Sequence, residues 1–186
     1  MSSLIELVDD SITDKNTTHS YLELYESLLI SKKEKAKNVL EIGVYDGGSI
    51  KLWYDYFQNA SIYGIDIKFK DSIAIFQNKE RICLSCFDAY DEEIYKTRFI
   101  KNIKFDMILD DGPHTLDSMI QCIKLYSQLL TEDGIFIIED VQDMTWIEVL
   151  YNAVPEHLKR FVKCYDLRAN KNRYDDIVFT INKSIY

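Results

Sequence analysis

The sequence predicts one α/β domain, in which a doubly wound sheet of seven mostly parallel strands is covered by helices on both faces. Short apolar runs alternate with amphipathic stretches from residue 38 onward, which is typical of strands joined by crossover helices. The strand-like runs are continuously apolar, as expected for parallel strands buried on both faces. The last two runs, "FVKCYDLR" and "DDIVFTINK", are joined by a linker too short for a crossover helix, so they are expected to pair as an antiparallel hairpin at the sheet edge.

Each element is located by its local pattern. Residues 3–31 are expected to be helical, because "SYLELYESLLI" repeats large apolar side chains at helical spacing. Strands are expected at "NVLEIGV", "SIYGIDI", "RICLSCF", "FDMIL" and "GIFIIE". The amphipathic stretches between them are "SIKLWYDYF", "SIAIFQ", "DEEIYKTRFI", "LDSMIQCIKLYSQLL" and "TWIEVLYNAV". We therefore divide a single domain, residues 1–186, into an N-terminal helical cap (1–37) and a Rossmann-like core (38–186).

Charge and composition exclude several classes of protein. With 31 acidic and 22 basic residues the net charge is −9, so we expect no nucleic-acid partner. The most basic run, "SKKEKAK" (31–37), is expected to be the solvated end of a helix, where the helix dipole favours lysine. No apolar run reaches the roughly 20 residues of a membrane helix, and the start lacks the basic flank of a signal peptide. We expect a cytoplasmic protein with no membrane partner.

The four cysteines lie in apolar periodic segments, so we expect them to be reduced and buried; they are Cys83, Cys86, Cys122 and Cys164. The oligomeric state cannot be read from the sequence. The apolar N-terminal helix can pack on its own sheet or on a second chain, so both a monomer and a homodimer stay open.

A ligand site is expected at the carboxyl ends of the strands, where doubly wound sheets bind their ligands. The stretch "VLEIGVYDGGSI" (39–50) predicts a strand, a tight turn and a helix start, with Gly43 and Gly47 or Gly48 allowing a close approach of the backbone to a ligand. The dinucleotide pattern GxGxxG is absent. Glu41 would repel a phosphate, so this turn favours a cationic or zwitterionic ligand.

Two more acids follow the next strands of the predicted sheet. Asp66 ends the second strand, where a carboxylate can accept hydrogen bonds from both hydroxyls of a ribose. Asp88 follows the third strand, where it can accept a hydrogen bond from an adenine amino group. These positions together indicate a nucleoside-containing ligand.

Carboxylates also crowd the tips of the fourth and fifth strands, in "DMILDDGPH" (106–114) and "GIFIIEDVQ" (134–142). If the two strands are neighbours, Asp111, Glu139 and Asp140 converge at one rim and repel each other. A hard divalent cation such as Mg²⁺ would relieve that repulsion. The alternative is that Asp110 and Asp111 merely cap the following turn.

The order of Glu41 with Gly43, then Asp66, Asp88 and Asp110 on successive strands resembles the class I S-adenosylmethionine-dependent methyltransferases. That family's sheet also has seven strands and a final antiparallel hairpin. The resemblance implies S-adenosylmethionine as cofactor, bound by these residues together with Gly47, Ser49 and Ala89. An ordinary strand-to-helix turn in another α/β protein is the alternative.

"DDGPH" with the downstream "IIEDV" is similar to a narrower group, the Mg-dependent macrolide sugar O-methyltransferases. The resemblance implies Asp111, Glu139 and Asp140 as metal ligands and His114 as general base. Pro113 stands where that group usually has serine, which removes a hydroxyl and a backbone donor. "TDKNTTHSYLELYESLL" (13–29) resembles a segment that caps the cofactor in these enzymes, which implies cofactor contacts from Lys15 and His19; a simple helix-start role for His19 is the alternative.

The resemblance implies an O-methyltransferase whose acceptor is a small molecule, with a sugar hydroxyl as first choice. The basic cluster of the loop "RANKNRYD" (168–175) either meets the phosphates of a nucleotide sugar or only solvates the loop. A metal-dependent methyltransferase of another small molecule such as a catechol, a hydroxylase-like relative and a non-catalytic binding protein on the same fold remain alternatives.

Overall fold

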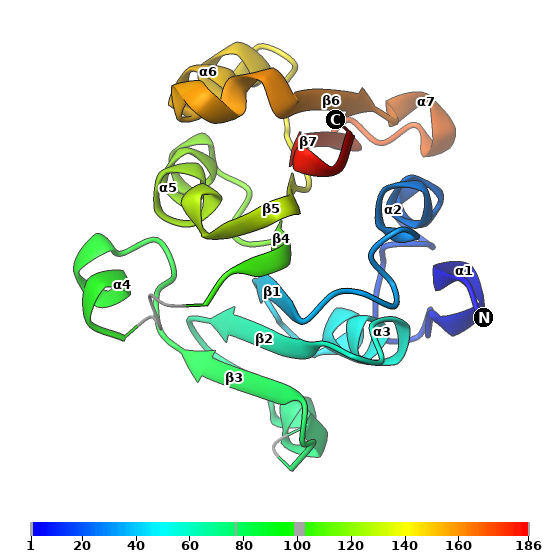
Figure 1. The fold of residues 1–186 in the computed structure, drawn as a ribbon. Helices are drawn as coiled ribbons and strands as arrows, with labels where there is room; N and C mark the ends of the chain where they lie inside the picture. Colours follow the sequence, from blue (N-terminus) through cyan, green and yellow to red (C-terminus); the bar gives the residue numbers. More distant parts are fainter. Residues whose placement is uncertain (1, 77, 99–102, 186) are drawn as a thin grey trace.

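The computed structural model describes residues 2–76, 78–98 and 103–185, and within them seven strands form one sheet (Figure 1). The strand order is β3-β2-β1-β4-β5-β7-β6. The strands from β1 to β5 pair in parallel, and β7 pairs antiparallel with both β5 and β6, so the predicted edge hairpin is confirmed. Their bounds are β1 Asn38–Ile42, β2 Ser61–Asp66, β3 Ile82–Cys86, β4 Phe105–Asp110, β5 Leu130–Ile138, β6 Val162–Asp166 and β7 Ile177–Asn182.

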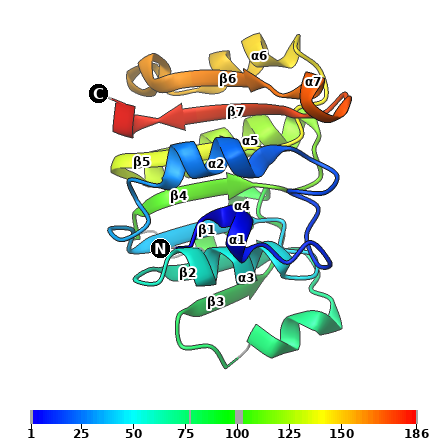
Figure 2. The same ribbon diagram turned by 90° about the vertical axis from the view of Figure 1, so that its right-hand side faces the viewer.

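Helices cover both faces of the sheet (Figures 1 and 2). One face packs against α1 (Leu4–Leu7), α2 (Tyr21–Leu29) and α3 (Gly48–Tyr56); the other packs against α4 (Glu92–Arg98), α5 (Leu116–Tyr126) and α6 (Trp146–Ala153). Strand side chains alternate between the two cores: Val39 of β1 joins the first and Leu40 the second. Both predicted layers of helices are therefore present.

Short helical segments complete the connections. Residues 72–76 of the predicted stretch "SIAIFQ" form part of the 3₁₀ helix η1 (Asp71–Phe76), and its last residue lies outside the described ranges. The loop between β6 and β7 contains α7 (Arg168–Lys171). The other 3₁₀ helices are η2 (Ser127–Leu129), η3 (Glu156–Phe161) and η4 (Lys183–Ile185). Within the described ranges, no helix combines the length and the apolar character needed to cross a bilayer.

The prediction of continuous helix over residues 3–31 is wrong. Between α1 and α2 the chain makes turns, in which the amides of Thr18 and His19 donate to the Asp14 carbonyl at 3.0 Å. This segment crosses the strand ends closely: a Cβ added to Gly48, at the start of α3, would lie 2.0 Å from the carbonyl oxygen of Ile12. We name residues 8–20 the N-terminal crossing segment.

The lysine run at 31–37 is also not simply solvated, since Lys32 and Lys33 are only 3% and 5% exposed. The Lys32 ammonium donates to the Asp133 carbonyl and lies 3.2 Å from an Asp133 carboxylate oxygen. The Lys33 ammonium donates to the Ser2 carbonyl and lies 4.7 Å from the Tyr56 ring centroid. Their long aliphatic stems pack in the protein while each ammonium finds an acceptor, which a charge count along the sequence cannot show.

The expectation of buried cysteines holds for Cys122 but is wrong for Cys83 and Cys86, which are exposed; Cys164 is half-buried. Both exposed thiols lie on β3, whose outer edge carries no further strand in the described sheet. All four thiols are free, as expected.

Arg81 stabilises the C-terminal end of α3. Its guanidinium donates to the carbonyls of Tyr54, Phe57 and Ala60 at 3.0, 2.9 and 2.6 Å, which ties the last turn of α3 to the turn that follows it. We expect Arg81→Met to lower the free energy of unfolding by about 1–3 kcal/mol, measured by urea denaturation. Lys51→Met, which removes a half-buried i,i+4 pair with Asp55 on the surface of α3, is the control and should cost about 0.5 kcal/mol or less. Equal losses in the two variants would contradict this role.

Candidate active site

Two adjoining cavities open at the carboxyl ends of the parallel strands. The first, the acidic cavity, has a volume of about 500 Å³ and lies between the N-terminal crossing segment and the tips of β4 and β5. The second, the apolar cavity, has a volume of about 430 Å³ and lies over the ends of β1 and β2. Four residues border both cavities, namely Gly43, Tyr45, Asp111 and Gly112. One elongated ligand can therefore extend from the apolar into the acidic cavity.

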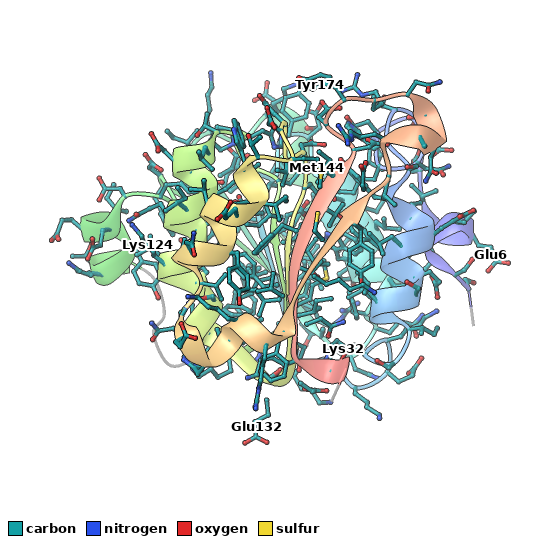
Figure 3. All side chains as sticks on the ribbon, turned by 90° about the horizontal axis from the view of Figure 1, so that it is seen from above. Glu6, Lys32, Lys124, Glu132, Met144 and Tyr174 are labelled. Atoms are coloured by element: carbon teal, nitrogen blue, oxygen red, sulfur yellow. The ribbon has the colours of Figure 1, made fainter. Side chains whose placement is uncertain are left out.

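Figure 3 shows the sheet from above, with Met144 and Tyr174 at one end of the strands and Lys32 and Glu132 at the other. Met144 follows β5 and Tyr174 precedes β7, so both lie on connections at the end where the parallel strands finish. The cavities lie at this end, as the general rule for doubly wound sheets predicts.

The turn between β1 and α3 depends on glycine. Gly43 has φ +88° and Gly47 has φ +86°, a region that other residues rarely adopt. A Cβ on Gly43 would lie 1.9 Å from the Asp111 carbonyl oxygen, so β1 and β4 approach each other here without a side chain between them. The tight turn predicted from the sequence is present.

We expect Gly43→Ala to lower the free energy of unfolding by more than about 2 kcal/mol, because the added methyl group meets backbone and the φ angle becomes unfavourable. Because the motif resemblance implies S-adenosylmethionine as cofactor, we also expect the variant to bind S-adenosylhomocysteine at least ~10-fold more weakly, measured by calorimetry, since the cavity wall must move. Gly64→Ala is the control: its Cβ would meet only side-chain methyl groups at 2.7–3.1 Å, so cofactor affinity should change less. Unchanged affinity in the Gly43 variant would contradict this prediction.

Three of the predicted cofactor contacts line the apolar cavity: Asp66, Asp88 and Ala89. One Asp66 oxygen accepts the amides of Val44 and Tyr45 at 2.8 and 2.9 Å, which fixes the glycine turn against β2. Predicted contacts Gly43 and Ser49 line the acidic cavity, and Gly47 is the N-cap of α3, next to Gly48 in the cavity wall.

Glu41 and Asp110 lie behind the cavity walls. Glu41 is fully buried and its oxygens have no hydrogen-bond partner among the described residues, although Ser49 and Trp53 face it. Burial raises the pKa of Glu41 to about 8, an effect that the nearby Lys15 ammonium opposes. Asp110 is 3% exposed and accepts a hydrogen bond from the Tyr90 hydroxyl at 2.5 Å; burial raises its pKa to about 6. The structure therefore gives Asp110 a protein partner, and Asp110 borders neither of the two cavities.

The predicted carboxylates Asp111, Glu139 and Asp140 do converge, because β4 and β5 are neighbours and end together. Asp111 and Asp140 flank His114, whose Nε2 lies 3.8 Å from Asp111 Oδ1 and 3.5 Å from Asp140 Oδ2. His114 and Asp140 have φ angles of +54° and +52°, unusual for residues with side chains. Such backbone is typical of functional sites, where the surrounding structure holds it in place.

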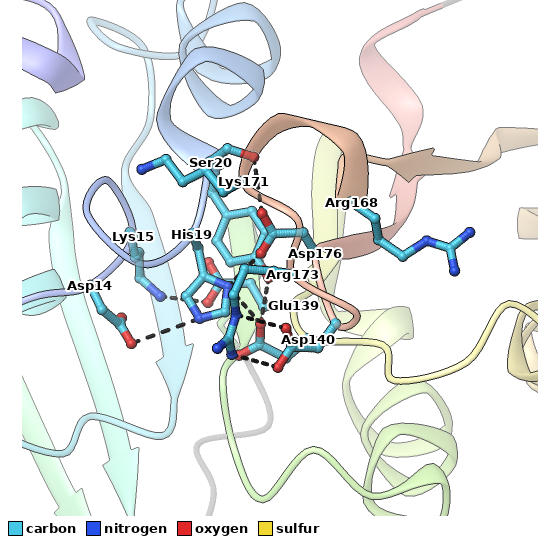
Figure 4. A network of polar contacts seen from close by, with 12 residues as sticks. Asp14, Lys15, His19, Ser20, Glu139, Asp140, Arg168, Lys171, Arg173 and Asp176 are labelled. Carbon is cyan, nitrogen blue, oxygen red and sulfur yellow. Dashed lines mark hydrogen bonds and ion pairs between the residues drawn. The ribbon is translucent and has the colours of Figure 1, made fainter.

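Lys15, which the motif resemblance assigns to the cofactor, lies among these carboxylates. Its ammonium donates to Asp111 Oδ2 at 2.6 Å and to Glu139 Oε2 at 2.5 Å. Figure 4 shows Lys15 beside Glu139. Burial alone would lower the pKa of Lys15, but the carboxylates of Asp111 and Glu139 outweigh it and raise the pKa well above its usual value. A protonated lysine therefore already fills part of the gap that the sequence assigns to a metal ion.

His19 lies in the same polar network rather than at a simple helix start (Figure 4). Its Nδ1 is 2.6 Å from Asp176 Oδ1 and 3.3 Å from Asp140 Oδ1, and His19 also lines the acidic cavity. Asp176 is fully buried and accepts the Ser20 hydroxyl at 3.1 Å through its other oxygen. The residue just before β7 thus supplies an acid that the sequence pattern did not single out.

Two tyrosines of α2 also reach the site and were missed as functional residues. The hydroxyl of Tyr21 donates to Asp140 and that of Tyr25 donates to Glu139. Both rings are buried and stacked, with centroids 5.7 Å apart. Their spacing of four residues is typical of the buried face of a helix, so the pattern alone predicts ordinary core residues. The one feature that could have indicated a further role is the hydroxyl group, which needs a hydrogen-bond partner when a tyrosine is buried.

Comparison with known proteins supports the resemblance drawn from the motifs. No established family model matches the sequence. The 8-demethyl-8-alpha-L-rhamnosyl tetracenomycin-C 2'-O-methyltransferase of Streptomyces olivaceus is 28% identical over 141 residues, covering 72% of this chain and 36% of its own length. The demethylmacrocin O-methyltransferase of Streptomyces fradiae is 25% identical over 151 residues, covering 77% and 37%. The chain therefore spans just over a third of the length of these curated relatives.

A solved structure confirms the predicted fold. The MycE methyltransferase from the mycinamycin biosynthetic pathway, in complex with Mg and S-adenosylhomocysteine, superposes with a TM-score of 0.76 at 22% identity. The match covers 97% of this chain and 54% of that one. At this identity the likeness shows the fold, which is the doubly wound methyltransferase fold with a final antiparallel pair.

Proposed function

We propose that this chain, which has the fold of the class I methyltransferases, is an S-adenosylmethionine-dependent and magnesium-dependent O-methyltransferase that acts on a sugar hydroxyl. The observation that carries the proposal is the position of Asp111, Asp140 and His114. These side chains lie on the wall of the acidic cavity, next to its junction with the apolar cavity. A cofactor in the apolar cavity would thus present its methyl group beside an acid–imidazole cluster.

The cavity walls fit S-adenosylmethionine. Asp66 and Asp88 offer carboxylates to ribose and adenine in the apolar cavity, whose wall is otherwise mainly apolar. Glu41 supplies a second observation: this buried carboxylate behind the cavity wall has no hydrogen-bond partner among the described residues, and in its ionised form it would attract the ammonium group of an amino acid bound in front of the wall. Both features support a ligand that joins a nucleoside to a zwitterion.

The side chains of the acidic cavity also fit a hard divalent cation, but some of them are better placed to bind it than others. Ligand atoms of Asp111, His114 and Asp140 lie within 4.8 Å of one another. Carboxylate oxygens are preferred ligands of Mg²⁺. Glu139 fits less well as it stands, because Lys15 binds one of its oxygens and Tyr25 the other. Asp111 and Asp140 are therefore the residues best placed to hold the ion.

The protein's part in the reaction is positioning and proton transfer. A bound cation would supply polarisation of an acceptor hydroxyl, and the bound cofactor would supply an electrophilic methyl group. His114 faces the carboxylates with its Nε2, so it can take the hydroxyl proton as the oxygen attacks. Tyr21 hydrogen-bonds to Asp140 and thereby fixes one wall of the reaction site. Pro113 restricts the backbone just before His114.

The sugar acceptor is supported by the curated relatives, whose names are those of sugar O-methyltransferases. The basic side chains of the 168–175 loop already have acceptors within the protein. Arg168 pairs with Asp166 at 2.7 Å and Arg173 pairs with Asp175 at 2.8 Å. Lys171 donates to backbone carbonyls of the N-terminal crossing segment, including Thr17 at 3.0 Å. We therefore propose an acceptor that is recognised through its hydroxyl groups.

The test is calorimetry with S-adenosylhomocysteine, followed by a screen of rhamnosides, nucleotide sugars and catechols with labelled cofactor and Mg²⁺. We expect cofactor binding and a gain of 14 mass units on a glycoside. Transfer to catechols alone would replace the sugar acceptor, and a gain of 16 mass units would indicate hydroxylation. Absence of cofactor binding would overturn the proposed function and favour a non-catalytic protein.

A further inference from the structure

We infer that Lys15 is a resident counter-ion of the active site, which keeps Glu139 out of the coordination shell of the divalent cation. The cation is then held by the outward oxygens of Asp111 and Asp140, and Glu139 is a positioning residue that acts through Lys15. The inference rests on the metal of the proposed function. It differs from the ligand set that the motif resemblance implies, in which all three acids bind the ion.

Both carboxylate oxygens of Glu139 already accept a hydrogen bond from a side chain. Lys15 Nζ donates to Oε2 at 2.5 Å, and the Tyr25 hydroxyl donates to Oε1. The side chain is only 1% exposed, compared with 24% for Asp111 and 13% for Asp140. To enter a coordination shell, Glu139 would have to exchange a buried charged partner for the ion.

Asp111 and Asp140 are placed differently. The Lys15 ammonium donates to Oδ2 of Asp111. The other oxygen, Oδ1, faces His114 and lies 3.8 Å from the His114 Nε2. The Tyr21 hydroxyl donates to Oδ1 of Asp140, and the other oxygen, Oδ2, lies 3.5 Å from the same His114 nitrogen. The two free oxygens therefore face one point beside the imidazole, and Lys15 has already neutralised one of the three acidic charges.

The position of Lys15 is built by its surroundings. The ammonium is buried, with 2% exposure, and the Tyr21 amide donates to the Lys15 carbonyl at 3.2 Å where α2 begins. On the other side, Lys171 donates to the carbonyls of the next residues, Asn16 and Thr17. Contacts on both sides therefore fix the turn that carries Lys15.

The experiment is a crystal structure of the full chain loaded with Mn²⁺, which replaces Mg²⁺ on oxygen ligands and gives anomalous signal. We expect the ion within coordination distance of Asp111 and Asp140, with Lys15 still bonded to Glu139. A Glu139 oxygen in the inner shell would overturn the inference while leaving the proposed function intact. If the wild-type chain binds no Mn²⁺, the metal of the proposed function fails, and the inference fails with it.

A double-mutant cycle tests the same point in solution, with Mn²⁺ affinity measured by electron paramagnetic resonance. In Lys15→Met the freed Glu139 can reach the ion, so Glu139→Gln should weaken binding at least ~10-fold more in that background than in the wild-type chain. Equal effects in both backgrounds would overturn the inference. Lys32→Met is the matched control, because Lys32 is equally buried but lies at the opposite end of the sheet, and it should leave Mn²⁺ affinity unchanged. Thermal denaturation without metal confirms that each variant is folded.

Discussion

Asp111→Asn is expected to lower the rate of methyl transfer at least ~1000-fold while S-adenosylhomocysteine affinity falls less than ~3-fold. The substitution keeps the shape of the side chain but removes one of the two negative charges that face His114. A divalent cation would lose an anionic ligand, and the acceptor hydroxyl would lose its position. Initial rates with saturating Mg²⁺, together with calorimetry of the cofactor analogue, separate the two effects.

Asp143→Asn is the matched control for this experiment. Asp143 is exposed, follows the same strand as Asp140, and accepts a hydrogen bond from the Thr145 amide instead of facing the cavity. It should retain near-normal rates. EDTA should abolish transfer by the wild-type chain and Mg²⁺ should restore it. Full activity in excess EDTA would remove the metal from the mechanism, whatever the effect of the Asp111 variant.

His114→Gln is expected to lower kcat by about 100- to 1000-fold, with little change in cofactor or Mn²⁺ affinity, because only proton removal is lost. His157, which is exposed on η3, supplies the control: His157→Gln should leave kcat unchanged. An unchanged rate at pH 7 in the His114 variant would exclude it as the base. In that case His19 would be the next residue to replace, since it also lines the acidic cavity.

The parts of the site that the sequence could predict are those governed by strand topology. Apolar runs ending in acids locate Asp66, Asp111 and Glu139, and parallel pairing brings such ends to one edge of a sheet. Adjacent acids are harder to separate. Asp110 closes β4 and turns into the core beside Tyr90, whereas Asp111 reaches the cavity, and only the register of the sheet decides between them.

The N-terminal crossing segment could not be predicted, because long-range contacts determine its path. Lys15 bonds to acids that are 96 and 124 residues away in the chain. Within residues 3–31 the chain is helical only in α1 and α2, which pack on one face of the sheet. Helical periodicity made Tyr21 and Tyr25 look like ordinary core residues, since a pattern of ring positions carries no information on where the hydroxyl points.

The left-handed backbone of Tyr45, His114 and Asp140 has an evolutionary consequence. Each of these residues borders a cavity and adopts a conformation that costs a side-chain-bearing residue of order 1–3 kcal/mol. Glycine at any of the three would relieve that cost, so selection for heat resistance alone would favour losing them. If these three residues are kept as the protein evolves, selection is therefore acting on catalytic turnover and not on the stability of the fold alone.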